Sequence, residues 1–208
     1  MTNRGVDEEK RATLRRFAAL GAATPFAGLG AAESDEEEAP ESGSDARDAI
    51  VGYVASTPGA HFSKVRDDLR LGTGETQYHL RRLVDDGVVE FTRDGDYKRF
   101  FPAGRFTPFE QTALGYLRRG TARGMLVALL RAPDATGSAL AAELDVSRAT
   151  VSNYARKLEE AGLLSREDGY TVLRPETVIT LLVRYADSFG PAAVSLANDA
   201  AGLIRYDP

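Results

Sequence analysis

Residues 73–86, TGETQYHLRRLVDD, place hydrogen-bonding and cationic side chains at helical spacing. Leu80 and Leu83 mark an inward face, which leaves Gln77 and Arg81 on the outward one. A glutamine amide can form two hydrogen bonds with the edge of an adenine, and an arginine can do the same with guanine or hold a phosphate. The outward face of such a helix therefore has the chemistry needed to read base pairs.

The elements that would position this helix occur twice along the chain. A shift of 75 residues superposes residues 45–89 on residues 120–164 without a gap. Arg81 then meets Arg156, and apolar character is kept where identity is lost. Two copies of one supersecondary unit explain this self-similarity better than chance does.

Each copy has the same predicted order of elements. The helices are 45–56, 63–69 and 74–86 in the first copy, and 121–131, 138–144 and 148–161 in the second. Ser63 and, in the second copy, Thr136 or Gly137 are suitable N-caps. Gly87 and Gly162 are suited to end the long helices in a left-handed conformation. Asp-Gly pairs at 94–95 and 168–169 then predict hairpin turns.

A helix, a helix-turn-helix and a hairpin make a winged helix. The sequence therefore predicts a mainly α fold with small β-hairpin wings: two tandem winged helix-turn-helix domains plus C-terminal helices. The predicted boundaries are a flexible segment 1–44, winged helices 45–104 and 105–174 joined by a linker at 104–120, and C-terminal helices 175–208. These last helices either pack on the second winged helix or form a homodimer interface.

Composition excludes several classes of function. The chain has 208 residues, no cysteine and two histidines, His61 and His79, so we expect no metal site, no cofactor and no enzyme activity. His61 is expected to start a helix and His79 to pack at a helix edge. The net charge is −5, but residues 1–48 hold 6 basic and 11 acidic groups, which leaves the remainder neutral. Bulk charge therefore gives no argument for nucleic-acid binding, which needs a local basic face. An acidic, lysine-poor composition rich in alanine and glycine is typical of halophiles.

The N-terminal segment has two interpretations. Basic residues precede an uncharged stretch within 15–32, and an acidic linker, 33–44, follows. This layout resembles an export signal or membrane anchor. The stretch is shorter than the roughly 20 apolar residues of a spanning helix, however, which favours a mobile tail or a weak amphipathic helix in a cytoplasmic protein.

The candidate DNA-contacting residues lie on the two long helices and on the first wing. In the second copy, Asn153 is the best base-reading candidate. The second wing has acidic residues at its tip, so we expect unequal copies. The full predicted set is Thr73, Glu75, Gln77, Tyr78, Arg81, Arg82, Arg93, Lys98, Arg99, Ser147, Arg148, Thr150, Ser152, Asn153, Arg156 and Lys157. The alternative for each arginine is an ordinary solvated face with ion pairs four residues apart.

Two stretches, GAHFSKVRDDLRLGTGETQYHLRRLVDDG and LDVSRATVSNYARKLEEAGLLSREDGY, resemble the tandem winged-helix transcriptional regulators of archaea, especially haloarchaea. Each half also resembles the winged helix of the MarR/ArsR type. The resemblance implies a transcriptional regulator that binds double-stranded DNA, with helices 74–86 and 148–161 in the major groove and no small-molecule ligand evident. Metal sensing of the ArsR type is not implied, because cysteines are absent. The alternative is a winged-helix module for protein–protein interaction, with or without a membrane tether.

Overall fold

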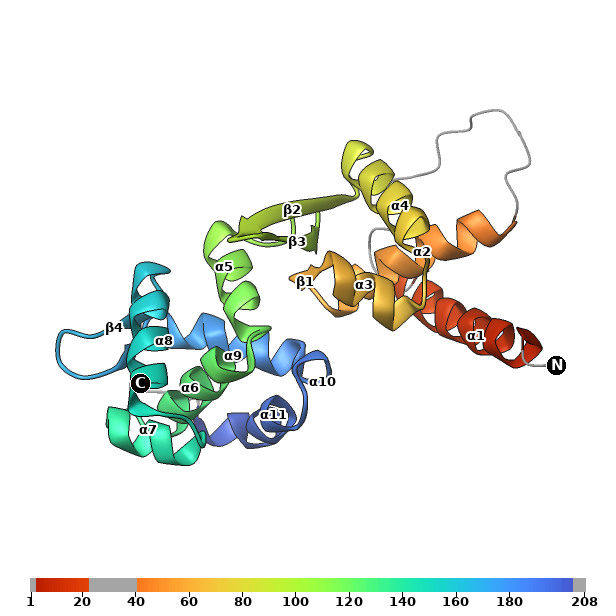
Figure 1. The fold of residues 1–208 in the computed structure, drawn as a ribbon. Coiled ribbons are helices and arrows are strands. Elements are labelled where there is room, and N and C mark those ends of the chain that lie inside the picture. Colours follow the sequence, from red (N-terminus) through yellow and green to blue (C-terminus); the bar gives the residue numbers. More distant parts are fainter. Residues whose placement is uncertain (1–2, 23–40, 204–208) are drawn as a thin grey trace. The chain divides into compact units, whose positions relative to one another are not determined.

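The structure is a computed structural model that describes residues 3–22 and 41–203 (Figure 1). It is mostly helical, with small antiparallel strand pairs, as the sequence predicts. The chain divides into two compact units, residues 1–106 and 107–208, which are described in turn. No helix in the described ranges is both long enough and apolar enough to cross a membrane.

Unit 1 contains a three-stranded sheet in the order β1-β3-β2 and four helices. Its elements are α1 (Asn3–Ala22), α2 (Glu41–Ser56), β1 (Ala60–His61), α3 (Phe62–Leu69), α4 (Thr73–Asp85), β2 (Val89–Asp94) and β3 (Tyr97–Pro102). Both strand pairs are antiparallel, and β2 with β3 forms the predicted wing. Helices α2, α3 and α4 enclose a core that includes Ile50, Tyr53, Leu69 and Leu83, none more than 1% exposed.

Helix α1 is a correction to the predicted flexible segment 1–44. It packs along α2, where Leu14 is buried and the Phe17 ring lies 5.2 Å from the Tyr53 ring, centroid to centroid. Phe17 of the stretch thus packs inside unit 1, which matches the amphipathic-helix alternative. The predicted acidic linker and most of the signal-like stretch lie outside the described residues.

The start of α3 differs slightly from the prediction. His61, not Ser63, is the N-cap, because its Nδ1 accepts a hydrogen bond from the Lys64 backbone N–H at 3.3 Å. This agrees with the expected role of His61 at a helix start. The wing turn is also displaced by one residue: Asp94 pairs with Tyr97, so the two-residue loop is 95–96 rather than 94–95.

Unit 2 repeats the order of helices seen in unit 1 and has further helices before and after that repeat. Its elements are α5 (Pro108–Leu117), α6 (Gly120–Arg131), α7 (Gly137–Glu143), α8 (Arg148–Glu160), β4 (Leu164–Ser165), β5 (Thr171–Val172), α9 (Pro175–Arg184), α10 (Ala186–Phe189) and α11 (Pro191–Leu203). Of the two candidate N-caps of α7, Thr136 and Gly137, Thr136 is the one that caps the helix. Gly87 and Gly162 follow α4 and α8 with φ of 69° each, the left-handed conformation that the sequence led us to expect.

Helix α5 replaces the predicted linker. Thr107 caps it by accepting a hydrogen bond from the Glu110 N–H at 3.3 Å, and the Glu110 carboxylate accepts one from the Thr107 N–H at 2.8 Å. This reciprocal capping box, with Pro108 at the first helical position, explains why a helix starts here.

The C-terminal helices pack within unit 2. Ala193 and Leu196 of α11 are fully buried, and α11 contacts α6, α9 and α10. The first of the two expected roles, packing on the second winged helix, is therefore present. The homodimer interface stays a prediction.

Candidate nucleic-acid interface

Helix α4 is built to hold one polar face outward. Thr76, Leu80 and Leu83 are buried at helical spacing, the two leucines as predicted. At its start, Glu75 reaches back to accept a hydrogen bond from the Gly72 N–H at 3.2 Å. Lys10 of α1 lies 3.3 Å from the same carboxylate, so the predicted contact residue Glu75 is half-buried and engaged in capping the helix.

The outward face of α4, here called its crest, carries Tyr78 and Arg81, and Thr73, Gln77 and Arg82 are also exposed. The Arg81 side chain is 83% exposed, and its Nε lies 3.8 Å from a carboxylate oxygen of Asp85. Arg82 donates a hydrogen bond to the Tyr78 hydroxyl at 3.3 Å, which raises the pKa of this arginine further. The crest therefore offers two cations, one of them beside an exposed aromatic ring.

One face of the wing points the same way. Alternate residues of a strand share a face, so Phe91, Arg93, Lys98 and Phe100 lie together. Arg93 and Lys98 are exposed, and the Lys98 ammonium lies 4.2 Å from the centre of the Phe91 ring. This cation–π contact holds a charge and an aromatic face side by side.

Arg99 is a correction. We predicted it as an exposed basic residue, but it lies on the opposite face of β3 and is 5% exposed. Its guanidinium pairs with Asp94 and donates a hydrogen bond to the Gly59 carbonyl oxygen at 3.0 Å. Arg99 therefore holds the wing to the loop before β1 and is unavailable to a ligand.

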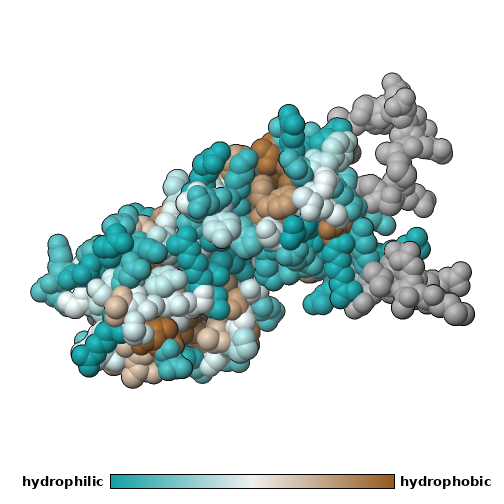
Figure 2. All heavy atoms as spheres, viewed as in Figure 1, coloured by the Kyte–Doolittle hydropathy of each residue, from teal (hydrophilic) through white to brown (hydrophobic). Residues whose placement is uncertain are grey.

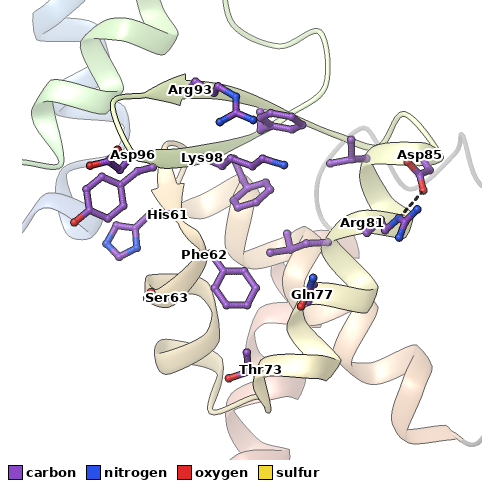
Figure 3. A pocket seen from close by; sticks show the side chains of 15 residues that line it. His61, Phe62, Ser63, Thr73, Gln77, Arg81, Asp85, Arg93, Asp96 and Lys98 are labelled. Atoms are coloured by element: carbon purple, nitrogen blue, oxygen red, sulfur yellow. Dashed lines mark ion pairs between the residues drawn. The ribbon is translucent and has the colours of Figure 1, made fainter.

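A groove of about 730 Å³ separates α4 from the wing (Figure 3). Its apolar residues are Phe62, Leu80, Val84, Phe91 and Phe100, and its polar ones are His61, Ser63, Thr73, Gln77, Arg81, Asp85, Arg93, Asp96, Tyr97 and Lys98. Hydrophobic surface is visible between the wing and α4, rimmed by hydrophilic side chains (Figure 2). In Figure 3, Arg93 and Lys98 lie on the wing side and Gln77 and Arg81 on the helix side.

The two histidines of the chain lie in unit 1. Burial, followed by the charges of Arg99 and Lys64, lowers the pKa of His61. Burial is also the main cause that lowers the pKa of His79. Both shifts favour the uncharged imidazole, so we do not count either ring among the cations of this face.

Helix α8 presents the equivalent face in unit 2. Val151, Ala155 and Leu158 are buried, and Ser152 and Asn153 are exposed together with Arg148 and Arg156. Arg156 donates hydrogen bonds to Glu160 at 2.6 Å and to the Asn153 side-chain oxygen at 3.3 Å.

Some predicted contact residues of unit 2 serve the helix itself. Ser147 caps α8 by accepting a hydrogen bond from the Thr150 N–H at 3.0 Å, and the two hydroxyls lie 2.9 Å apart. The Lys157 ammonium lies 5.5 Å from the centre of the Tyr154 ring, and Lys157 is half-buried. The second wing is short, and its Arg166 pairs with Glu159 at 3.3 Å.

Comparison with known proteins agrees with this geometry. Residues 44–114 match a family described as an N-terminal HTH domain, and residues 113–173 match the MarR family. The chain is a tandem winged helix-turn-helix protein. It is 26% identical over 130 residues to an uncharacterized HTH-type transcriptional regulator of Methanocaldococcus jannaschii, a match that covers 62% of this chain and 32% of the relative. The chain thus spans about a third of the length of the curated relative that it matches. No solved structure matches.

In this tandem winged helix-turn-helix protein, the sequence did not reveal the groove. Phe62, Phe91 and Tyr97 belong to α3, β2 and the end of the wing, and only the fold brings them to one surface. The alternation of Phe91 with Arg93 was the available signal, because it puts an aromatic ring and a cation on one strand face.

Proposed function

We propose that this tandem winged helix-turn-helix protein is a cytoplasmic regulator of transcription that binds specific double-stranded DNA sequences. In the proposal, α4 and α8 each enter a major groove and present their outward faces to base edges, as the recognition helices of helix-turn-helix proteins do. The first wing adds Arg93 and Lys98 at the phosphate backbone.

The observation that carries the proposal is the equivalence of Arg81 and Arg156. Each lies on the exposed crest of its helix, opposite a buried stripe, and each has a carboxylate four residues later, Asp85 or Glu160. An exposed ion pair of this kind contributes at most about 1 kcal/mol. A guanine edge or a phosphate can therefore displace the carboxylate at little cost. Because the ion pairs contribute so little to stability, a purely structural role does not explain the two arginines.

The two helices would offer similar chemistry to base edges, each with an amide beside an arginine. Asn153 has an amide that can pair with adenine, next to Arg156, which can pair with guanine. In α4, Gln77 can pair with adenine beside Arg81. We therefore expect a two-part recognition sequence with one part for each helix, and residues such as Arg93 and Lys98 that strengthen binding without regard to sequence.

The test starts from a random duplex library selected with the full-length protein. Affinities for the selected site are then measured by fluorescence anisotropy at one fixed salt concentration. Arg81→Ala and Arg156→Ala should each weaken binding by about 1–3 kcal/mol and relax preference at one position of the site. Neither should change the melting temperature. Arg131→Ala is the matched control, because Arg131 is also exposed and pairs with Asp199 at 3.2 Å, but lies on α6.

Two results would contradict the proposal. One is the failure of the library to yield a shared sequence. The other is a drop in melting temperature for both variants with binding unchanged, which would make the arginines structural. If the library does yield a motif, chromatin immunoprecipitation at native salt identifies the target genes.

A homodimer through α9–α11 stays a prediction, and light scattering tests it against the monomer mass of 22.4 kDa.

A further inference from the structure

We infer that the groove of unit 1 is a second kind of nucleic-acid site, one that binds an unpaired strand. Bases would stack on the exposed rings of Tyr97 and Phe91, and phosphates would lie on Arg81, Arg93 and Lys98. This site goes beyond the duplex reading proposed above and does not depend on α8.

The exposed aromatic side chains of the described residues lie in unit 1, and two of them, Phe91 and Tyr97, line the groove. Among the described residues, the exposed large apolar side chains are Tyr78, Phe91 and Tyr97 in unit 1 and Leu173 and Val183 in unit 2. All three aromatic residues thus lie on α4 or the wing of unit 1, with Tyr97 55% exposed. A cluster of exposed apolar groups rimmed by polar ones marks an interaction surface.

Aromatic faces favour an unpaired strand over a duplex. In a duplex the faces of the bases are stacked on one another, and a protein reaches only their edges and the backbone. An unpaired base offers a free face, and stacking on an aromatic ring contributes about 1–3 kcal/mol per base. Tyr97 begins β3 on the strand face that Arg99 shares, opposite to Phe91, and its ring lies 5.3 Å from the His61 ring. Both residues line the end of the groove at the wing tip and offer a second place for a base to stack.

The cations of the groove favour a nucleic acid. They lie on both walls, with Arg81 on α4 and Arg93 and Lys98 on the wing, so a backbone running along the groove meets charge on either side. The carboxylates of the same lining are Asp85 and Asp96, which leaves three cations against two anions. Arg81 is only loosely held by Asp85 at 3.8 Å, and the Lys98 ammonium already lies beside the Phe91 ring at 4.2 Å.

Unit 2 provides an internal comparison. Its wing strands have two residues each, against six in unit 1, and its wing tip carries Glu167 and Asp168. No aromatic residue is exposed on α8 or on that wing among the described residues. If aromatic stacking in the groove binds a strand, unit 2 should contribute nothing to it.

The experiment uses the full-length protein and a fluorescent oligothymidylate of about 12 nucleotides, within the length that one such site covers. Tyr97→Leu keeps an apolar side chain and removes the ring face, and Tyr97→Phe keeps the ring. We expect Tyr97→Leu to weaken binding of the strand by about 5-fold or more and Tyr97→Phe to leave it unchanged. Arg156→Ala should leave it unchanged as well, although it weakens duplex binding.

A second readout locates the strand directly. An oligonucleotide that carries 5-iododeoxyuridine is crosslinked under long-wavelength light, and the joined peptide is identified by mass spectrometry. Crosslinks to the segment with Phe91 and Tyr97 support the proposal.

Three results would overturn it: no binding of the single strand, equal binding by Tyr97→Leu and the wild type, or loss caused by Arg156→Ala instead. Each leaves the duplex proposal standing, because the selected duplex site tests that separately. The first would make an acidic peptide the better occupant of the groove.

Discussion

Arg81 in unit 1 and Arg156 in unit 2 occupy the same position of the repeat, yet their surroundings differ. Arg81 borders a groove with aromatic rings and a wing of six-residue strands. Arg156 has Asn153 and Glu160 as hydrogen-bond partners and a wing of two-residue strands. The buried stripes beneath are alike, which shows that the repeat preserves the core of each unit while the outward faces diverge.

The difference bears on how each unit can bind. Unit 2 has short polar side chains on its helix, suited to hydrogen bonds with base edges. Unit 1 adds apolar surface, whose contribution to binding is less sensitive to salt than ion pairs with phosphate are. At high salt, this surface would keep affinity where phosphate contacts weaken.

The largest predicted effect tests whether the two cores are independent. Leu83 and Leu158 are equivalent in the repeat, and both are fully buried. Leu83→Ala should destabilise unit 1 by about 2–5 kcal/mol, since it leaves a cavity, and Leu158→Ala should do the same to unit 2. Hydrogen-exchange mass spectrometry resolves the two halves. Each variant should lose protection only in its own unit, and an equal loss in both halves would mean that the chain unfolds as one body.

The next effect separates two neighbours on one strand. Arg99→Ala should destabilise unit 1 by about 3 kcal/mol, because it removes a buried ion pair with Asp94 and the hydrogen bond to Gly59. Lys98→Ala should stay within about 0.5 kcal/mol of the wild type in urea unfolding, because Lys98 is exposed. It should instead weaken binding of a nucleic acid. Equal losses of stability in the two variants would contradict the assignment of Arg99 to a buried face of β3 and Lys98 to an exposed one.

Much of this frame could be predicted from the sequence. The repeat predicted the order of the helices, and helical spacing identified Leu80 and Leu83 as core residues. Period-2 alternation also implied that Lys98 and Arg99 could not share a face. Which of the two side chains is buried depends on β1, whose two residues pair with β3 and bring Gly59 to Arg99. A strand this short has no periodic signal of its own.

Two other elements were missed for different reasons. The capping box of α5 was readable, because Thr107 and Glu110 stand three residues apart with Pro108 between them. Helix α1 could not be distinguished from a signal-like stretch, because its apolar residues suit either role. Its partner is the Tyr53 side of α2, and only tertiary contact identifies it.

The smallest predicted effect concerns the start of α4, where Gly74 stands at the position that Ala149 occupies in α8. A Cβ at Gly74 would meet no atom within 4 Å, so Gly74→Ala should stabilise unit 1 by about 0.5 kcal/mol through helix propensity. Urea unfolding measures the gain, and no gain would contradict it. Anisotropy with the selected duplex should show unchanged affinity, because α8 carries the same methyl group on its outward face. A loss of affinity despite the gain in stability would mean that α4 approaches its ligand more closely than α8 does, with glycine retained for that approach.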